Sequence, residues 1–87
     1  MKYAAVIEYG TDEAVVQSVR PVHREYLKAL KESGRLAASG PFTDGSGALI
    51  IYEAETAADA EALLRDDPFH RAGVFASWVL RPWNQVM

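Results

Sequence analysis

Apolar residues occupy both sides of two stretches, residues 2–9 and residues 48–54. Their content of residues that favour strands predicts a strand in each, the first ending at Gly10-Thr11-Asp12. A strand that is apolar on both faces is typical of a covered sheet, so we expect both to be central. The apolar positions are Tyr3, Ala4, Ala5, Val6, Ile7 and Tyr9 in the first, and Leu49, Ile50, Ile51 and Tyr52 in the second.

Two other stretches have helical periodicity. The first is predicted to begin at Pro21, a residue suited to the first helical position, and to run to about Ser33 before Gly34. Residues 12–20 are open to interpretation as a loop or a turn of helix. The second helix follows Thr56, a suitable N-cap, and ends near Asp67. The apolar arc of the first helix contains Val22, Tyr26, Leu27, Ala29 and Leu30.

The remaining segments complete a β-α-β-β-α-β order. Strands are predicted over residues 36–42 and 74–83, with a turn at 43–47 and a connection at 69–73. This order predicts an α+β, ferredoxin-like βαββαβ fold, with a four-stranded antiparallel sheet and two helices on one face. Two helices cover only one face of the sheet. We therefore expect a homodimer in which the sheets of two copies bury each other's open face.

Composition narrows the class of protein. A chain of 87 residues, 49% of them hydrophobic, is expected to form one domain over residues 1–87. It has no cysteine, which excludes disulfides and cysteine-based metal sites. Nine basic residues are scattered in a chain of net charge −3, which argues against nucleic acid as a partner. The sequence shows no signal peptide or membrane span, so we expect a cytoplasmic protein with no membrane partner.

A histidine and a carboxylate are the candidate catalytic groups. His23 falls inside the apolar arc of the first helix, and Asp67 continues the apolar stripe of the second, whereas Asp66 points to solvent. Strand direction then places the start of the first helix and the end of the second at one edge of the sheet. The alternatives stay open: Asp67-Pro68 is also a common way to end a helix, and an inward histidine is often structural.

The same edge receives the end of the second strand, with Ser39, Gly40 and Pro41. We expect these residues to border one cleft with the His23–Asp67 pair. There Asp67 would orient His23 as a general base, and the Ser39 hydroxyl or nearby amides would stabilise negative charge. Gly40 would let a substrate approach the backbone, and Arg20 would anchor an anionic group. A helix N-terminus disfavours imidazolium and a carboxylate favours it, so the charge state of the ring is open.

Other residues that could take part in catalysis or binding are expected to have different roles. His70 is expected at the surface, and Trp78 and Trp83 in the core or at a dimer interface. Ser39 lacks the sequence context of a serine nucleophile. With only two histidines and no matching carboxylate spacing, we expect no dedicated metal site, and the alternative of the His23–Asp67 pair with one further ligand stays open. No cofactor is expected.

Several short blocks together resemble the YCII-related (YciI-like) family. They are Arg20-Pro21-Val22-His23, Tyr26-Leu27, Gly34-Arg35-Leu36, Ser39-Gly40-Pro41-Phe42, Asp66-Asp67-Pro68-Phe69 and Gly73. The resemblance implies a dimeric α+β barrel and an active site at His23 and Asp67. A related enzyme removes chloride from chlorinated hydroxyhydroquinones, and related barrels include muconolactone isomerases and small monooxygenases.

Three hypotheses follow for function. The first is a cofactor-independent enzyme that performs acid/base chemistry, either a dehydrochlorinase-like elimination or an isomerisation, on a small cyclic or aromatic compound. The second is a non-catalytic dimer that binds a small ligand in the same cleft. The third gives the His23–Asp67 pair a purely structural role.

Overall fold

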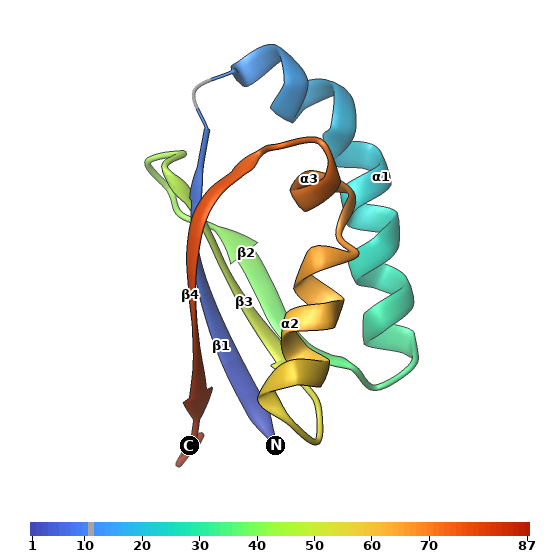
Figure 1. The fold of residues 1–87 in the computed structure, drawn as a ribbon, viewed down its shortest axis with the longest axis vertical. Coiled ribbons are helices and arrows are strands. Elements are labelled where there is room, and N and C mark those ends of the chain that lie inside the picture. The colour runs from blue at the N-terminus through green and yellow to red at the C-terminus, as the bar shows by residue number, and fades with distance from the viewer. Residues whose placement is uncertain (11) are drawn as a thin grey trace.

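The computed structural model describes residues 1–10 and 12–87, so Thr11, part of the expected end of the first strand, lies outside the described residues. The sheet has the order β2-β3-β1-β4 with every neighbouring pair antiparallel. The helices lie together on one side of it (Figure 1). This confirms the ferredoxin-like fold and the central places of the first and third strands. The elements are β1 (Lys2–Tyr9), α1 (Glu13–Glu32), β2 (Leu36–Pro41), β3 (Gly47–Glu53), α2 (Ala57–Arg65), α3 (Pro68–Arg71) and β4 (Phe75–Trp83).

The first helix begins well before Pro21, so the predicted start is wrong. Asp12 is the N-cap, and its carboxylate accepts hydrogen bonds from the amides of Ala14 and Val15 at 3.1 and 3.3 Å. Pro21 therefore lies inside α1, where it removes one backbone hydrogen bond. Figure 1 shows the first turns of α1 set at an angle to the rest, as a proline inside a helix favours.

The buried face of α1 agrees with the predicted arc in part. Its buried positions are Val16, His23 and Leu30, spaced seven residues apart, and Tyr26 and Leu27 are half-buried beside them. Ala29, expected in the arc, is exposed. Val22, expected in the apolar arc, is 58% exposed. The prediction placed it inward because it started the helix at Pro21 and left out Val16, which extends the buried face toward the N-terminus.

The second helix is α2, capped by the Thr56 hydroxyl, which accepts a hydrogen bond from the Asp59 amide at 3.1 Å. The connection expected at residues 69–73 contains the short helix α3. Pro68 occupies its first turn and Asp67 is its N-cap, so the Asp-Pro pair that ends one helix also begins the next.

The core lies between the sheet and the three helices. Its largest fully buried side chains include Tyr52, Phe69 and Ile7. None of the helices described in residues 1–10 and 12–87 covers the opposite face of the sheet (Figure 1), and Val6, Leu49 and Val79 are 45%, 38% and 58% exposed there. The fold therefore leaves an apolar face open.

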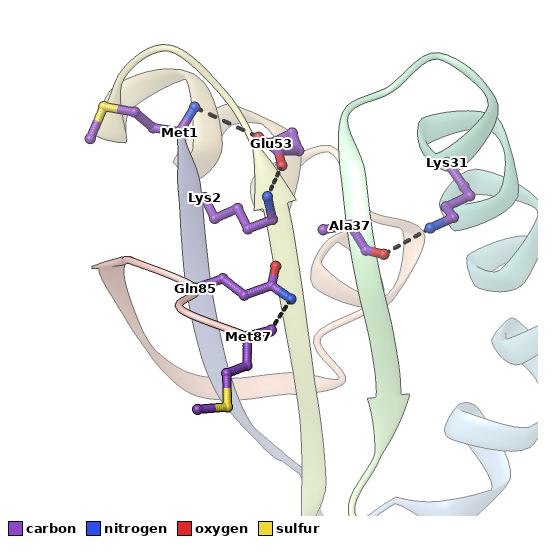
Figure 2. A network of polar contacts seen from close by, with 7 residues as sticks. All are labelled: Met1, Lys2, Lys31, Ala37, Glu53, Gln85 and Met87. Carbon is purple, nitrogen blue, oxygen red and sulfur yellow. Dashed lines mark hydrogen bonds and ion pairs between the residues drawn. The ribbon is translucent and has the colours of Figure 1, made fainter.

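An ion pair joins the start of β1 to the end of β3. Lys2 and Glu53 are partners in the β1–β3 register, and the Lys2 ammonium lies 2.6 Å from the Glu53 carboxylate (Figure 2). The hydrogen bond from Lys2 lowers the pKa of Glu53 below its ordinary value. The amino group of Met1 adds a weaker contact at 3.6 Å.

Gly47 begins β3 where the backbones of β1 and β3 approach closely. A Cβ at this position would lie 1.8 Å from the carbonyl oxygen of Ile7. Since that atom belongs to the central strand, Gly47→Ala is expected to cost about 1–3 kcal/mol of the free energy of unfolding, measured by urea denaturation. The control is Gly10→Ala, because the nearest described atom outside its chain neighbours would lie 3.7 Å from a Cβ there. Equal stability of the two variants would contradict the expectation.

Candidate active site

His23 and Asp67 meet beneath the middle of α1. The Nδ1 atom of His23 lies 2.7 Å from the Oδ1 atom of Asp67, and the two residues are only 6% and 0% exposed. The expected contact is therefore present. Its setting differs from the expectation, because His23 lies in the second half of α1 and not in its first turn. The helix dipole acts mainly within a terminal turn, so the argument that it disfavours imidazolium no longer applies.

A second hydrogen bond of Asp67 indicates which partner carries the proton in its contact with His23. The Oδ1 atom of Asp67 also accepts the backbone N–H of Phe69 at 2.8 Å, as the N-cap of α3. An amide nitrogen can only donate, so Oδ1 accepts this hydrogen bond. We therefore assign a proton to Nδ1 of His23, which donates it to the same oxygen. In the neutral ring this tautomer leaves the lone pair on Nε2. Asp66 is exposed, as predicted, and pairs with Arg71 at 3.1 Å.

Phe69 holds the face of the imidazole ring. The centroids of the His23 and Phe69 rings are 3.9 Å apart and the rings are almost parallel, at 12°. The Phe75 ring meets His23 edge-on at 6.4 Å. A hydrogen bond in the ring plane and a stacked ring on its face fix the orientation of His23. Sequence reasoning gave Phe69 no role, although it follows Asp67 by two residues in the segment that carries the candidate carboxylate.

The charge of Asp67 affects the pKa of three tyrosines, Tyr9, Tyr26 and Tyr52. Burial raises the pKa of each phenol, and the negative charge of Asp67 raises it further. The pKa of Tyr26 rises to about 12. Its hydroxyl donates to the carbonyl oxygen of Leu63 at 2.6 Å. Within the described residues, the Tyr52 hydroxyl and Asp67 Oδ2 are buried with no hydrogen-bond partner. These tyrosines were not singled out in the sequence, because strand and helix periodicity indicates only that they face inward.

The two inner tyrosines provide a matched test of this polar layer. Tyr26→Phe removes the donor to Leu63 and is expected to lower the free energy of unfolding by about 1–2 kcal/mol. Tyr52→Phe removes a hydroxyl that has no partner among the described residues, so its stability should equal or exceed that of the wild type. Urea unfolding of both variants checks the order. A larger loss for Tyr52→Phe would contradict it.

A groove of about 480 Å³ runs between α1 and β2, with β3 and Phe69 at its base. His23 lines it, and so do the other residues expected there: Arg20, Ser39, Gly40 and Pro41. Asp67 does not line the groove; it lies behind His23. Since Asp67 takes Nδ1, Nε2 is the ring nitrogen left for a ligand in the groove.

The expectation for Gly40 meets a geometric difficulty. Gly40 pairs with Leu49, whereas its neighbours Ser39 and Pro41 pair with the groove residues Ile50 and Ala48. Side chains alternate along a strand, so a Cβ at Gly40 would point to the opposite face of the sheet, where nothing lies within 4 Å. Gly40 thus borders the groove through its backbone, and the groove itself does not require a glycine there.

Other polar and aromatic residues lie outside the groove. His70 is half-buried, with its ring 5.1 Å from that of Trp78, and Trp83 is exposed at the end of β4. Among residues 1–10 and 12–87, no three histidine or acidic side chains gather as a metal site would require. No helix in this part of the chain has the length and apolar character needed to cross a membrane.

Comparisons with known proteins agree with this architecture. The solved structure of 5-chloro-2-hydroxyhydroquinone dehydrochlorinase (TftG) from Burkholderia phenoliruptrix, in complex with 2,5-dihydroxybenzoquinone, matches with a TM-score of 0.84 and 24% identity, over 97% of this chain and 94% of that one. Protein YciI from Escherichia coli O6:H1 and from Shigella flexneri is 32% identical, over 79% of this chain and 81% of each relative. Residues 1–84 match the YCII-related domain. The chain therefore belongs to the YCII-related family.

Proposed function

We propose that this protein is a small, cofactor-independent cytoplasmic enzyme that uses His23 and Asp67 for general acid/base chemistry. Its substrate would be a small cyclic or aromatic compound bound in the groove. The observation that carries the proposal is the 2.7 Å contact between Asp67 and Nδ1 of a histidine that lines the groove. Such a contact fixes the tautomer whose Nε2 accepts a proton.

In an elimination, Nε2 of His23 takes a proton from a ring carbon of the substrate. The electrons of the broken C–H bond form the new π bond, and the leaving group departs from the adjacent carbon with its bonding pair. Asp67 stabilises the imidazolium that results, because its carboxylate faces Nδ1. The Ser39 hydroxyl and neighbouring amides, with Gly40 and Pro41 beside them, would bind a substrate oxygen that gains negative charge. An isomerisation would use the same base and return the proton to another carbon.

The structural relative supports an elimination. TftG is a dehydrochlorinase, and its solved structure holds a small quinone. We therefore propose chlorinated or hydroxylated ring compounds as the first panel of substrates, with chloride release and ultraviolet spectra as the readouts. Turnover that is abolished in His23→Ala supports the proposal. A panel member turned over equally well by wild type and variant would contradict it.

The alternative is a regulatory or carrier dimer that binds a small ligand in the groove without transforming it. The buried, fully stacked imidazole also suits a ligand-binding role, since it presents one polar atom in a largely fixed position. This function predicts saturable binding with unchanged ligand after long incubation. Product formation by the purified protein would reject it.

We further propose that two copies pack through the open faces of their sheets to form a dimeric α+β barrel. The support is the row of exposed apolar side chains at Val6, Leu49 and Val79, opposite the face that the helices cover. Burial of this exposed apolar area against a second copy would stabilise the dimer.

Two valines with equal exposure test this dimer. Val79 on the open face and Val22 on α1 are each 58% exposed. Val79→Lys places charges in the proposed interface and is expected to give a monomer by size-exclusion chromatography with light scattering. Val22→Lys adds the same charge on the helical side and should remain dimeric. A monomeric wild type, or the same mass for both variants, would contradict the sheet-to-sheet arrangement.

A further inference from the structure

One wall of the groove is strongly basic although the chain is acidic overall. The wall formed by α1 contributes Arg20, Arg24, Lys28 and Lys31, and the lining includes no Asp or Glu. The whole chain has nine Lys and Arg against twelve Asp and Glu. The basic wall is therefore a local concentration of charge and does not follow from composition.

Helix geometry explains how these residues reach the same groove. Their spacing of four, four and three residues keeps them within an arc of about 80° along some 16 Å of α1. The acidic residues Glu25 and Glu32 fall on another side of the helix and do not line the groove. The result is a row of cations beside His23.

Three of the four cations have no acidic partner. Among residues 1–10 and 12–87, Arg20, Arg24 and Lys28 form no ion pair. Lys31 is engaged, since its ammonium donates to the carbonyl oxygen of Ala37 on β2 at 2.8 Å (Figure 2). That contact ties α1 to β2 beside the groove and leaves the other three cations to face a ligand.

Arg20 and Arg24, the two arginines of the row, line the groove beside the candidate base His23. Both arginines line the groove with Tyr9, and their positive charges oppose the larger effect of burial, which raises the pKa of this phenol. Tyr9 lines the groove together with His23. The base of the groove is apolar, with Leu27, Ile50 and Phe69 among its lining residues.

We propose, on the basis of the acid/base function above, that the groove selects cyclic or aromatic carboxylates, with the ring over the apolar base and the carboxylate on Arg24 and Lys28. A guanidinium fork matches a carboxylate, and unpaired like charges along one wall favour an anion. A phosphate is less well suited, because phosphate sites typically use backbone amides at a helix N-terminus, and the first turn of α1 does not line this groove.

Equilibrium binding tests the proposal without needing turnover. Isothermal titration at a fixed physiological salt concentration would compare 1,2,4-benzenetricarboxylate, benzoate and the neutral benzamide. We expect affinity to fall in that order. Arg24→Gln and Lys28→Gln should each weaken binding of the tricarboxylate about tenfold. Arg65→Gln, an exposed cation on α2 outside the groove, removes the same charge and should leave the affinity unchanged.

The outcomes separate this proposal from the proposed catalysis. Benzamide bound as tightly as benzoate, or an equal loss in all three charge variants, would overturn the carboxylate site. His23→Ala should keep its affinity for the tricarboxylate within about twofold, since the base does not hold the carboxylate. Carboxylate binding that depends on Arg24 and Lys28, with no turnover in any substrate panel, would support this site while contradicting the enzyme.

Discussion

Replacing His23 by alanine is expected to lower kcat/KM on a turned-over substrate by about 10²–10⁴-fold, the typical contribution of a positioned general base. The reason is geometric: His23 is the one histidine that lines the groove, and its ring is fixed by Asp67 and Phe69. Steady-state kinetics of the purified variant would measure the loss. Added imidazole should restore part of the rate, because the substitution leaves a space of the same shape.

The control for this variant is His70→Ala. His70 is half-buried against Trp78 and does not line the groove, so its removal should change kcat/KM less than threefold. His23→Gln, which better preserves side-chain volume, separates loss of the base from loss of packing against Phe69. An active His23→Gln enzyme would show that the imidazole is not the base.

Asp67→Asn is expected to reduce kcat/KM by about 10²–10⁴-fold while the protein stays folded. The asparagine oxygen can still cap α3 by accepting the Phe69 amide, but its neutral amide group no longer holds a positive imidazolium. Because the same oxygen contacts both His23 and Phe69, the asparagine oxygen can still accept the proton on Nδ1, so the loss of rate comes from the missing negative charge. In this variant kcat/KM should therefore fall while the melting temperature stays close to that of the wild type.

Asp67→Ala provides the comparison. It removes the cap as well as the contact to His23, and it is expected to lose a further 1–2 kcal/mol, on the order of a helix N-cap, from the free energy of unfolding. If Asp67→Asn lowered the melting temperature as far as Asp67→Ala and left kcat/KM intact, the pair would be structural.

The fold was predictable because its signals are local. The two-sided apolar character of β1 and β3 indicates central strands, and the order of the elements selects the ferredoxin-like arrangement. The meeting of His23 and Asp67 was predictable in part. The periodicity of α1 indicates that His23 is buried. Asp67 is buried too, but it lies beyond the end of α2 as the N-cap of α3 and not on the helical stripe that the prediction extended to it.

Three features could not be predicted: the start of α1, the short helix α3 and the row of unpaired cations. In each case the local sequence signal was weak or pointed to another structure. Pro21 is typical of a helix start, so the stronger capping by Asp12 and the earlier start of α1 were missed. The helix α3 is too short to show periodicity, and the stacking of Phe69 on His23 depends on it. The row of unpaired cations was missed for a related reason, because Arg20 precedes the predicted helix start and was considered alone.

The state of the His23 ring nitrogens is the most direct test of the account, because it requires no substrate. Nitrogen-15 NMR of the imidazole, recorded where the ring is neutral, distinguishes a protonated from an unprotonated nitrogen. The contact with Asp67 predicts a protonated Nδ1 and a lone pair on Nε2, with this preference lost in Asp67→Ala, which removes the acceptor. A proton on Nε2 in the wild type, or the averaged signals of a freely exchanging surface histidine, would contradict a base held in place by Asp67.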